Sequence, residues 1–180
     1  GRLIKLKRNH DLINTLYKLP FDYELIFLGD GDELIKLQQL SKNLNLESRV
    51  HFMGRVKNPY KYISKCDFLV NCSESEGFPN VLVEAMICKT LVISSDCISG
   101  PREILYPSSD INIQIKEKYE ISEFGILFPV GRIDLLEEAI IKISKNEMNY
   151  STIVESAFER SYCYSKDSII KQYSEVLKGE

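Results

Sequence analysis

The chain has 180 residues, a formal net charge of −3, and hydrophobic and charged fractions of 44% and 27%. These proportions are ordinary for a globular domain, and the slightly acidic balance argues against a dedicated nucleic-acid-binding protein. No apolar run approaches the roughly 20 residues of a membrane span, and no signal peptide is recognisable. The sequence therefore predicts one soluble, cytoplasmic enzyme or binding domain.

The cysteines and histidines do not suggest a metal or redox site. Two histidines are too few for a histidine-built site, and no C-x-x-C pair occurs. We therefore expect no bound metal and five free thiols, most of them small core residues. The cysteines are Cys66, Cys72, Cys88, Cys97 and Cys163.

The N-terminal region combines a glycine, a basic loop and a short amphipathic helix. Gly1-Arg2-Leu3 is followed by basic residues, and Asn9 is the expected N-cap of a helix that Pro20 stops. A glycine before such a loop and helix normally follows a β-strand, and none precedes Gly1 here. We therefore expect the 180 residues to be a fragment of a longer protein.

The rest of the chain alternates between two patterns. Apolar runs typical of buried parallel strands lie at 23–28, 49–53, 67–71, 91–94 and 125–129. Helical patterns lie at 32–43, 59–65, 79–89, 101–105, 133–143, 151–162 and 166–178. The polar stretch 106–124 is expected to be the least structured part, a surface excursion. The alternation predicts a Rossmann-like, doubly wound α/β domain over residues 1–180, with C-terminal helices over 149–180.

In a doubly wound sheet, ligands bind beyond the carboxyl ends of the strands. The segments expected there are 1–11, 29–32, 54–59, 72–80 and 94–101. Glycines in them permit close backbone approach, and helix starts after Phe78 and after Gly100 could aim free N–H groups at an anion. Gly29-Asp30-Gly31 lacks the third glycine of a dinucleotide fingerprint, so a plain tight turn is favoured. No P-loop motif occurs.

Two glutamates flank the most informative segment, EGFPNVLVE. Glu84 is the one charged residue in an otherwise apolar helical stretch, where a carboxylate calls for a hydrogen-bonding partner or a ligand. If Glu76 were helical too, the pair would be roughly 12 Å apart along the axis. Carboxylates at that spacing could bind the hydroxyls of a ribose and of a sugar, with the helix N-terminus facing a diphosphate. The alternative is a solvated Glu76 and a structural Glu84.

Six segments in order resemble one family. They are GRL with Lys7, LIFLGDGDE, VHFMGRV, EGFPNVLVE, SGPREIL and GILFPVG. The segment EGFPNVLVE resembles the E-x7-E motif of retaining glycosyltransferases with the GT-B fold, family 4. This family is also described as glycosyl transferases group 1. The chain is similar to their C-terminal, donor-binding half from Gly1 to the last helix. The resemblance implies one of the two Rossmann-like domains of a GT-B architecture.

The resemblance also implies roles for individual residues. Arg2 and Lys7 match the basic pair that neutralises the donor diphosphate, and Glu76 matches the glutamate that contacts the donor sugar, which makes these three the expected catalytic residues. Glu84 matches the glutamate that holds the ribose hydroxyls. The other expected donor-binding residues are Arg55 and Val56 near the base, Gly77 and Phe78 through backbone N–H groups, and Asn80; the Ser99-Gly100 pair is a weaker candidate.

The sequence departs from the family pattern in two places. Arg8 is inserted after Lys7, so Lys5 or Arg8 could take the place of Lys7, and the excursion 106–124 is longer than usual. The resemblance implies that the terminal helix 166–178 packs back toward an acceptor-binding first domain of roughly 170–200 residues. Because that domain is missing here, we expect the 180 residues alone to be inactive.

The implied function is transfer of a sugar from a UDP-sugar or GDP-sugar, with retention and without a metal, in the synthesis of bacterial cell-surface polysaccharide. The expected partners are the nucleotide-sugar, the chain's own N-terminal domain, and an acceptor glycan or lipid-linked glycan, but no nucleic acid. The expected location is the cytoplasm, with a peripheral membrane contact through the first domain. Two alternatives stay open: a non-catalytic nucleotide-binding module, and a GT-B nucleotide-sugar epimerase, which the Glu76–Glu84 spacing disfavours.

Overall fold

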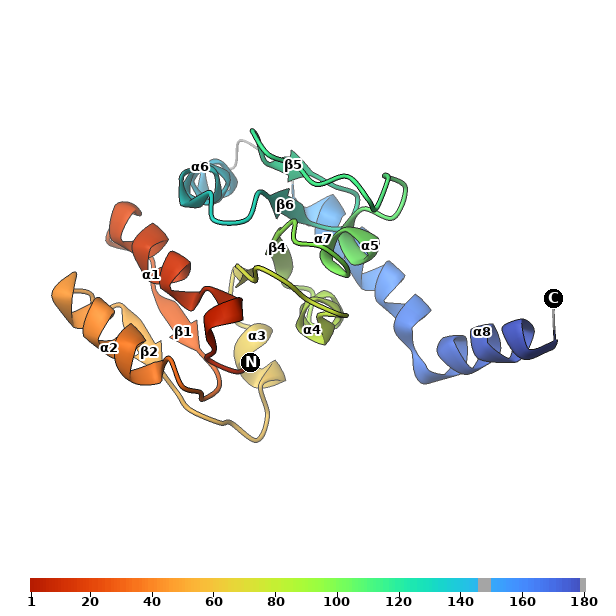
Figure 1. Cartoon of the computed structure of the whole chain (residues 1–180), viewed down its shortest axis with the longest axis horizontal. Helices are drawn as coiled ribbons and strands as arrows, with labels where there is room; N and C mark the ends of the chain where they lie inside the picture. Colours follow the sequence, from red (N-terminus) through yellow and green to blue (C-terminus); the bar gives the residue numbers. More distant parts are fainter. Residues whose placement is uncertain (146–149, 179–180) are drawn as a thin grey trace.

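The computed structural model describes residues 1–145 and 150–178 as an α/β fold (Figure 1). Its strands fall into two sheets. One contains β1 (Leu25–Phe27) and β2 (Val50–Phe52), and the other has the order β3 (Phe68–Asn71), β4 (Leu91–Ser95), β6 (Ile126–Phe128), β5 (Glu120–Ile121). All pairs are parallel except β5 with β6. The predicted fold class, α/β with parallel strands, is confirmed.

The helices connect and cover these strands. They are α1 (Asn9–Lys18), α2 (Leu34–Asn43), α3 (Tyr60–Ile63), α4 (Asn80–Ile87), α5 (Pro101–Leu105), α6 (Ile133–Ser144), α7 (Ser151–Ser161) and α8 (Lys166–Lys178), with short 3-10 helices η1 (Lys5–Lys7) and η2 (Tyr162–Tyr164). Each predicted helix is present within a few residues of its expected bounds. The short 3-10 helix η1 was not predicted.

Strand β4 is the centre of the core. All five of its residues are buried, and its three apolar side chains alternate between two apolar clusters. Leu91 and Ile93 pack with the buried residues of α6, whereas Val92 packs with those of α4 and α5. A strand that is covered on both faces reads as a continuous apolar run, which is why the sequence LVIS identified it. Truncating Ile93 to alanine is therefore expected to cost about 2–5 kcal/mol of stability.

A separate apolar cluster joins the first part of the chain. It contains Leu3, Ile13, Leu16, Phe27, Leu37, Leu46 and Val50 from α1, α2 and the β1–β2 sheet. The rings of Phe27 and Phe52 stack at 5.2 Å between centroids, across this parallel pair. The cluster includes Leu3, so the N-terminal segment is packed into the fold and held in position there.

The start of α1 differs from the prediction. The N-cap is Arg8 in the left-handed region, with φ 47°, and Asn9 is already the first helical residue, so the assignment of Asn9 as the N-cap was wrong. The extra residue, Arg8, takes the conformation that turns the chain from η1 into α1. A non-glycine residue rarely adopts this left-handed conformation, so it marks the turn between η1 and α1.

The excursion 106–124 is more ordered than expected, because it contains β5. This strand is antiparallel to β6, with Glu120 opposite Leu127 and Ile121 opposite Ile126. A short polar strand at a sheet edge has little apolar pattern, so the sequence gives no signal for it.

The last helix, α8, projects away from the two sheets (Figure 1). It has no buried residue among those described, and Tyr173, Val176 and Leu177 are exposed. Its packing onto a preceding domain stays a prediction. Residues 149, 179 and 180 of the expected C-terminal helical region lie outside the described residues. Among the described residues, no helix is long and apolar enough to cross a membrane.

Candidate functional site

The loops that follow β3 and β4 lie against each other at the carboxyl end of the sheet. Ser75 and Ile98 form a parallel bridge between them. Gly100, with φ 82°, closes the contact, because a Cβ there would lie 2.8 Å from the Gly77 carbonyl oxygen and would overlap the Pro79 ring. A glycine is therefore needed at this position to let the two loops approach.

Buried polar side chains fix the start of the first loop. The Ser73 hydroxyl donates to Asn71 Oδ1 at 2.8 Å, and Asn71 Nδ2 donates to the Ser94 hydroxyl at 3.2 Å. The Ser95 hydroxyl donates to the Ser73 carbonyl at 2.6 Å. Because all four residues are buried, this network holds the loop in one geometry just before Glu76.

Lys7 and Glu76 form the central ion pair of the site. Lys7 Nζ donates to Glu76 Oε1 at 2.5 Å, and the two side chains are 26% and 10% exposed. A backbone hydrogen bond of 2.8 Å from Glu74 N to Leu6 O joins the same two segments. The structure thus brings together two of the three predicted catalytic residues. Of the basic residues near the inserted Arg8, Lys7 is the one that pairs with Glu76.

Arg8 is directed elsewhere. Its Nε donates to Asp11 Oδ2 at 2.8 Å, and its guanidinium lies beside Gly131. Lys5 is exposed. Lys7 is therefore the basic residue of this stretch that faces Glu76.

Glu84 is half-buried on α4. Among the described residues it has no hydrogen-bond or ion-pair partner, so no structural hydrogen bond accounts for its charge. Burial lowers the pKa of the Gly1 amino group, the nearby Lys7 ammonium lowers it further, and the Glu84 carboxylate opposes both. Gly1, Lys7 and Glu84 thus lie within electrostatic range of one another.

The Glu76 carboxylate lies close enough to the Cys97 thiol to affect its pKa. Burial raises the pKa of Cys97 to about 11, and the Glu76 carboxylate adds to the shift. Glu76 itself precedes the helix, since α4 begins at Asn80 with Pro79 as its N-cap. The condition under which Glu76 and Glu84 would be roughly 12 Å apart along one helix is therefore not met, because Glu76 lies in the loop before α4 and Glu84 lies within it.

The first turn of α4 is open to an anion. No side chain caps it, and Asn80, its first residue, is exposed. Asn80 N donates to Phe78 O at 3.0 Å and Leu82 N donates to Pro79 O at 2.9 Å, so the attraction for a phosphate or carboxylate comes mainly from the partial positive charge at the helix start. The start after Gly100 is different, because Glu103 accepts the Gly100 N–H at 3.3 Å.

Gly77 and Phe78 lie on the exposed rim between Glu76 and α4. The Phe78 ring tilts against the Tyr164 ring, 5.5 Å between centroids, which joins this rim to η2. Gly77 itself is exposed.

The remaining predicted residues are on the rim formed by the first sheet. Arg2 and Arg55 are exposed and make no ion pair in the described part of the chain, and Val56 is half-buried. Arg55 follows Gly54, which has φ 65° after β2. Nothing in the described residues joins Arg55 or Val56 directly to Glu76 or Glu84.

Two glycines act in a way that the sequence did not reveal. A Cβ at Gly29 would overlap the Gly1 carbonyl, and one at Gly31 would overlap the backbone of Leu3. The G-x-G pattern read as a plain tight turn. Its glycines also allow the N-terminal segment to run against the end of β1, which fixes the approach of Arg2 and Lys7 to the site.

A buried ion pair beside the site also escaped prediction. Arg102 Nη2 donates to Asp96 Oδ2 at 2.6 Å, with Asp96 at the end of β4 and Arg102 in α5. A lone aspartate directly after an apolar strand, with an arginine in the next helix, was the available signal. In the described part of the chain, no group of three or more metal-ligating side chains is present.

Comparison with known proteins gives consistent relatives. The sequence matches the family model described as Glycosyl transferases group 1 over residues 1–160. An uncharacterized glycosyltransferase of Methanocaldococcus jannaschii is 33% identical, over 99% of this chain and 48% of the relative. N-acetylgalactosamine-N,N'-diacetylbacillosaminyl-diphospho-undecaprenol 4-alpha-N-acetylgalactosaminyltransferase of Campylobacter jejuni is 31% identical, over 99% of this chain and 45% of the relative.

Among solved structures, HepE of Anabaena in complex with UDP has a TM-score of 0.85 and 26% identity, over 100% of this chain and 47% of HepE. The same protein with UDP-glucose has a TM-score of 0.84. The chain spans about half the length of these relatives and structures.

Proposed function

The chain belongs to the glycosyl transferases group 1 family, as its motifs indicated, and we propose that it is the donor-binding half of a retaining glycosyltransferase. The proposed donor is a UDP-sugar, bound beyond the carboxyl ends of the strands between η1 and α4. The UDP and UDP-glucose complexes of HepE support the choice of UDP over GDP.

The observation that carries this proposal is the ion pair of Lys7 with Glu76. It joins residues 69 apart in the sequence at the open start of α4, with the unpartnered Glu84 on the same helix. A cation and an uncapped helix start suit a diphosphate, whereas carboxylates suit the hydroxyls of two sugars. Lys7 and Arg2 are proposed to bind the diphosphate, Glu76 the transferred sugar and Glu84 the ribose.

The proposed reaction breaks the bond between the anomeric carbon and the diphosphate oxygen. The electron pair leaves with the diphosphate, where Lys7, Arg2 and the start of α4 stabilise the growing negative charge. An acceptor hydroxyl oxygen then bonds to the anomeric carbon on the face that the diphosphate leaves, and its proton passes to an oxygen of the departing diphosphate. Gly77, Phe78 and Asn80 are proposed to line the donor through their backbone, and Arg55 and Val56 to adjoin the base.

We further propose that the full protein holds a second domain that binds the acceptor, and that no metal or other cofactor is required. The lipid-linked diphospho-undecaprenol named for the Campylobacter relative supports a lipid-linked glycan as the acceptor. The proposed place of action is the cytoplasm, at the membrane surface.

Calorimetric titration of UDP tests the ribose role of Glu84. Glu84→Gln is expected to raise the Kd about 10- to 150-fold, because a hydrogen bond to a charged group contributes about 1.5–3 kcal/mol. The melting temperature should change little, since no internal partner is lost. Glu159→Gln makes the same substitution at an exposed position on α7, and this control should bind UDP like the parent chain.

An unchanged Kd in Glu84→Gln together with a large loss of stability would remove the ribose role. A parallel pair tests the diphosphate: Lys7→Ala should weaken UDP binding at least tenfold, whereas Lys5→Ala, an exposed neighbour in η1, should not. Binding of GDP as tightly as UDP would remove the proposed base preference. Turnover of UDP-glucose without acceptor by the full protein would favour an epimerase.

A further inference from the structure

A hollow lies between the loop that follows β4 and the excursion 106–124. Its cavity volume is about 250 Å³, just below the roughly 300–1,000 Å³ of small-molecule sites. The residues that line it are Ile98, Ser99, Glu103, Ile111, Asn112 and Gln114. None of these six belongs to the residues proposed above to bind the donor, so the hollow is a separate feature of the surface.

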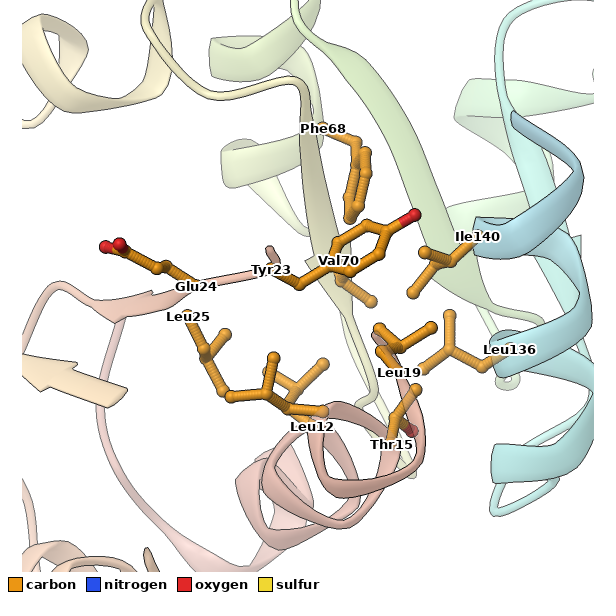
Figure 2. A pocket seen from close by; sticks show the side chains of 11 residues that line it. Leu12, Thr15, Leu19, Tyr23, Glu24, Leu25, Phe68, Val70, Leu136 and Ile140 are labelled. Atoms are coloured by element: carbon orange, nitrogen blue, oxygen red, sulfur yellow. The ribbon is translucent and has the colours of Figure 1, made fainter. Parts of the chain in front are cut away.

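The hollow differs from the apolar slot drawn in Figure 2. That slot lies among α1, α6, β3 and the start of β1, and its cavity volume of about 50 Å³ is too small for a drug-sized ligand. Its side chains are mostly apolar, and the Glu24 carboxylate points away from it (Figure 2). The slot therefore belongs to the packing of the core, whereas the hollow has the size and the polar groups of a binding site.

Two buried residues hold the excursion against the loop after β4. The Asp96 carboxylate accepts the Ile115 N–H at 2.8 Å, and the Asp96 carbonyl accepts Gln114 Nε2 at 2.7 Å. Arg102 Nη1 donates to Ser109 Oγ at 3.1 Å, so the residues between Ser109 and Gln114 are held at both ends. The excursion, which is longer than the family pattern, thus supplies one wall of the hollow in a fixed position.

The polar atoms of the hollow that have no partner are mostly hydrogen-bond acceptors. Glu103 Oε1 accepts the Gly100 N–H at 3.3 Å, and the side-chain amides of Asn112 and Gln114 donate within the chain. Among the described residues, nothing donates to Glu103 Oε2, Asn112 Oδ1 or Gln114 Oε1. The Ser99 hydroxyl has no partner there either. A ligand that donates several hydrogen bonds therefore suits the hollow.

The chemistry of the lining favours a neutral ligand that is rich in hydroxyl groups. None of the six lining residues is basic, so the hollow offers a phosphate no cation, unlike the stretch that carries Lys7. Ile98 and Ile111, which are 69% and 51% exposed, add apolar surface beside the acceptors. A sugar ring combines hydroxyl donors with apolar C–H faces, so it matches both parts of the lining.

The hollow adjoins the loop that carries Glu76. Ile98 in its wall forms a parallel bridge with Ser75, the residue before Glu76. Gly100, beside the lining residue Ser99, packs closely against the carbonyl of Gly77, the residue after Glu76. A ligand in the hollow would therefore lie next to the sugar that Glu76 is proposed to bind.

We propose that the hollow holds one saccharide unit of the acceptor glycan. This inference rests on the proposed function, because it places the acceptor relative to the proposed donor. Glu103 and Gln114 accept hydrogen bonds from the hydroxyl groups of this sugar, and Ile98 contacts its C–H face. The second domain proposed above binds the rest of the acceptor.

An NMR titration that follows the isoleucine methyl signals of the 180-residue chain tests the proposal. The probes are the methyl α-glycosides of glucose, galactose, N-acetylglucosamine and N-acetylgalactosamine, each added alone, with UDP and with UDP-glucose. At least one glycoside is expected to shift the signals of Ile98 and Ile111. Its Kd should be in the millimolar range, as for other ligands of about a dozen heavy atoms. Neither UDP nor UDP-glucose should displace it.

Two substitutions locate the glycoside. Glu103→Gln should raise its Kd about fivefold, because a neutral amide oxygen is a weaker acceptor than a carboxylate. Asn112→Ala, which removes one acceptor, should raise the Kd about threefold or more. Glu117→Gln makes the same change as Glu103→Gln at an exposed position of the excursion outside the lining, and it should leave the Kd unchanged.

The UDP and glycoside arms separate this proposal from the proposed function. UDP binding without any glycoside shift at Ile98 and Ile111 would overturn the acceptor site and leave the proposed function standing. Absence of UDP binding would remove the proposed function, and the acceptor role with it. Displacement of the glycoside by UDP-glucose would assign the hollow to the donor sugar. Shifts of the same methyl signals with calcium chloride in place of the glycosides would show a cation site, and either of these last two results would overturn the proposal.

Discussion

The buried pair of Asp96 and Arg102 gives the sharpest stability prediction. Arg102 is 6% exposed and Asp96 1% exposed. The guanidinium donates twice to the carboxylate, from Nε at 3.0 Å and from Nη2 at 2.6 Å, and also contacts Ser109 Oγ at 3.1 Å. Asp96 Oδ2 additionally accepts the Ile115 N–H at 2.8 Å, so the pair connects β4, α5 and the excursion 106–124.

Arg102→Met keeps the apolar stem but removes every donor. It leaves the Asp96 carboxylate buried away from water. Among the described residues, the Ile115 N–H is then the hydrogen-bond donor that remains to this carboxylate. Breaking a buried pair in this way costs about 3–5 kcal/mol, because an uncompensated charge remains. For a chain of this size, that loss corresponds to a fall in melting temperature of about 6–20 °C.

Thermal and urea unfolding followed by circular dichroism measures this loss. Arg132→Met is the matched control, because Arg132 pairs with Asp134 at 2.6 Å but both side chains are about half exposed, at 43% and 53%. An exposed pair contributes about 0–1 kcal/mol. Both arginines donate two hydrogen bonds to their aspartate, so the difference between the two losses of stability measures the effect of burying the pair.

A double variant decides the cause. Adding Asp96→Asn to Arg102→Met removes the buried charge but keeps an oxygen for the Ile115 N–H, so it should recover more than about 1 kcal/mol. Equal losses in Arg102→Met and Arg132→Met, or a double variant no more stable than Arg102→Met, would refute the reasoning.

Three further predictions follow from the same contacts. Gly29→Ala should lower the melting temperature and weaken UDP binding more than Gly54→Ala. Both glycines have positive φ, but of the two only Gly29 would bring a Cβ against other atoms, those of Gly1. Equal effects of the two variants would contradict the close packing of Gly29 against Gly1. Cys163 should react with iodoacetamide at pH 8 while Cys97 does not, because a pKa of about 11 leaves only about one Cys97 thiol in a thousand ionised. The same shift should lower the free energy of unfolding as the pH rises from 9 to about 11, because in that range the Cys97 thiol ionises in the unfolded chain but not in the folded one. Fast labelling of Cys97 in the folded chain would exclude its burial. The 180-residue chain should bind UDP without transferring glucose from UDP-glucose to any acceptor, and robust transfer would show that no second domain is needed.

The fold was predictable where burial leaves a mark on the residue pattern. The strand β4 begins with three consecutive apolar residues because both of its faces are covered, and the helices carry apolar stripes that face the sheets. The two-residue strand β5 and the left-handed Arg8 leave no such mark, since the first depends on its neighbour β6 and the second on one inserted residue.

The candidate site was predictable in its members and less so in its geometry. The glutamates were picked out by type and spacing, and the helix predicted over 79–89 already left Glu76 in the preceding loop, but only the structure shows that Glu76 pairs with Lys7. Contacts between residues far apart in the chain depend on how the loops are held, here by Ser73, Ser95 and Gly100. The sequence singled out Gly100 as the residue before a helix, but no sequence pattern marks Ser73 or Ser95 as holding the loop.

The position of Lys7 depends on both sheets at once. Its segment is bonded to the end of β1 through Leu3 and to the end of β3 through Leu6, so any relative shift of the sheets would move its ammonium away from Glu76. An ion pair that is only partly buried contributes too little energy to resist such a shift by itself. The rigidity of the site must therefore come from the backbone hydrogen bonds on either side, from Leu3 N to Asp30 O and from Glu74 N to Leu6 O.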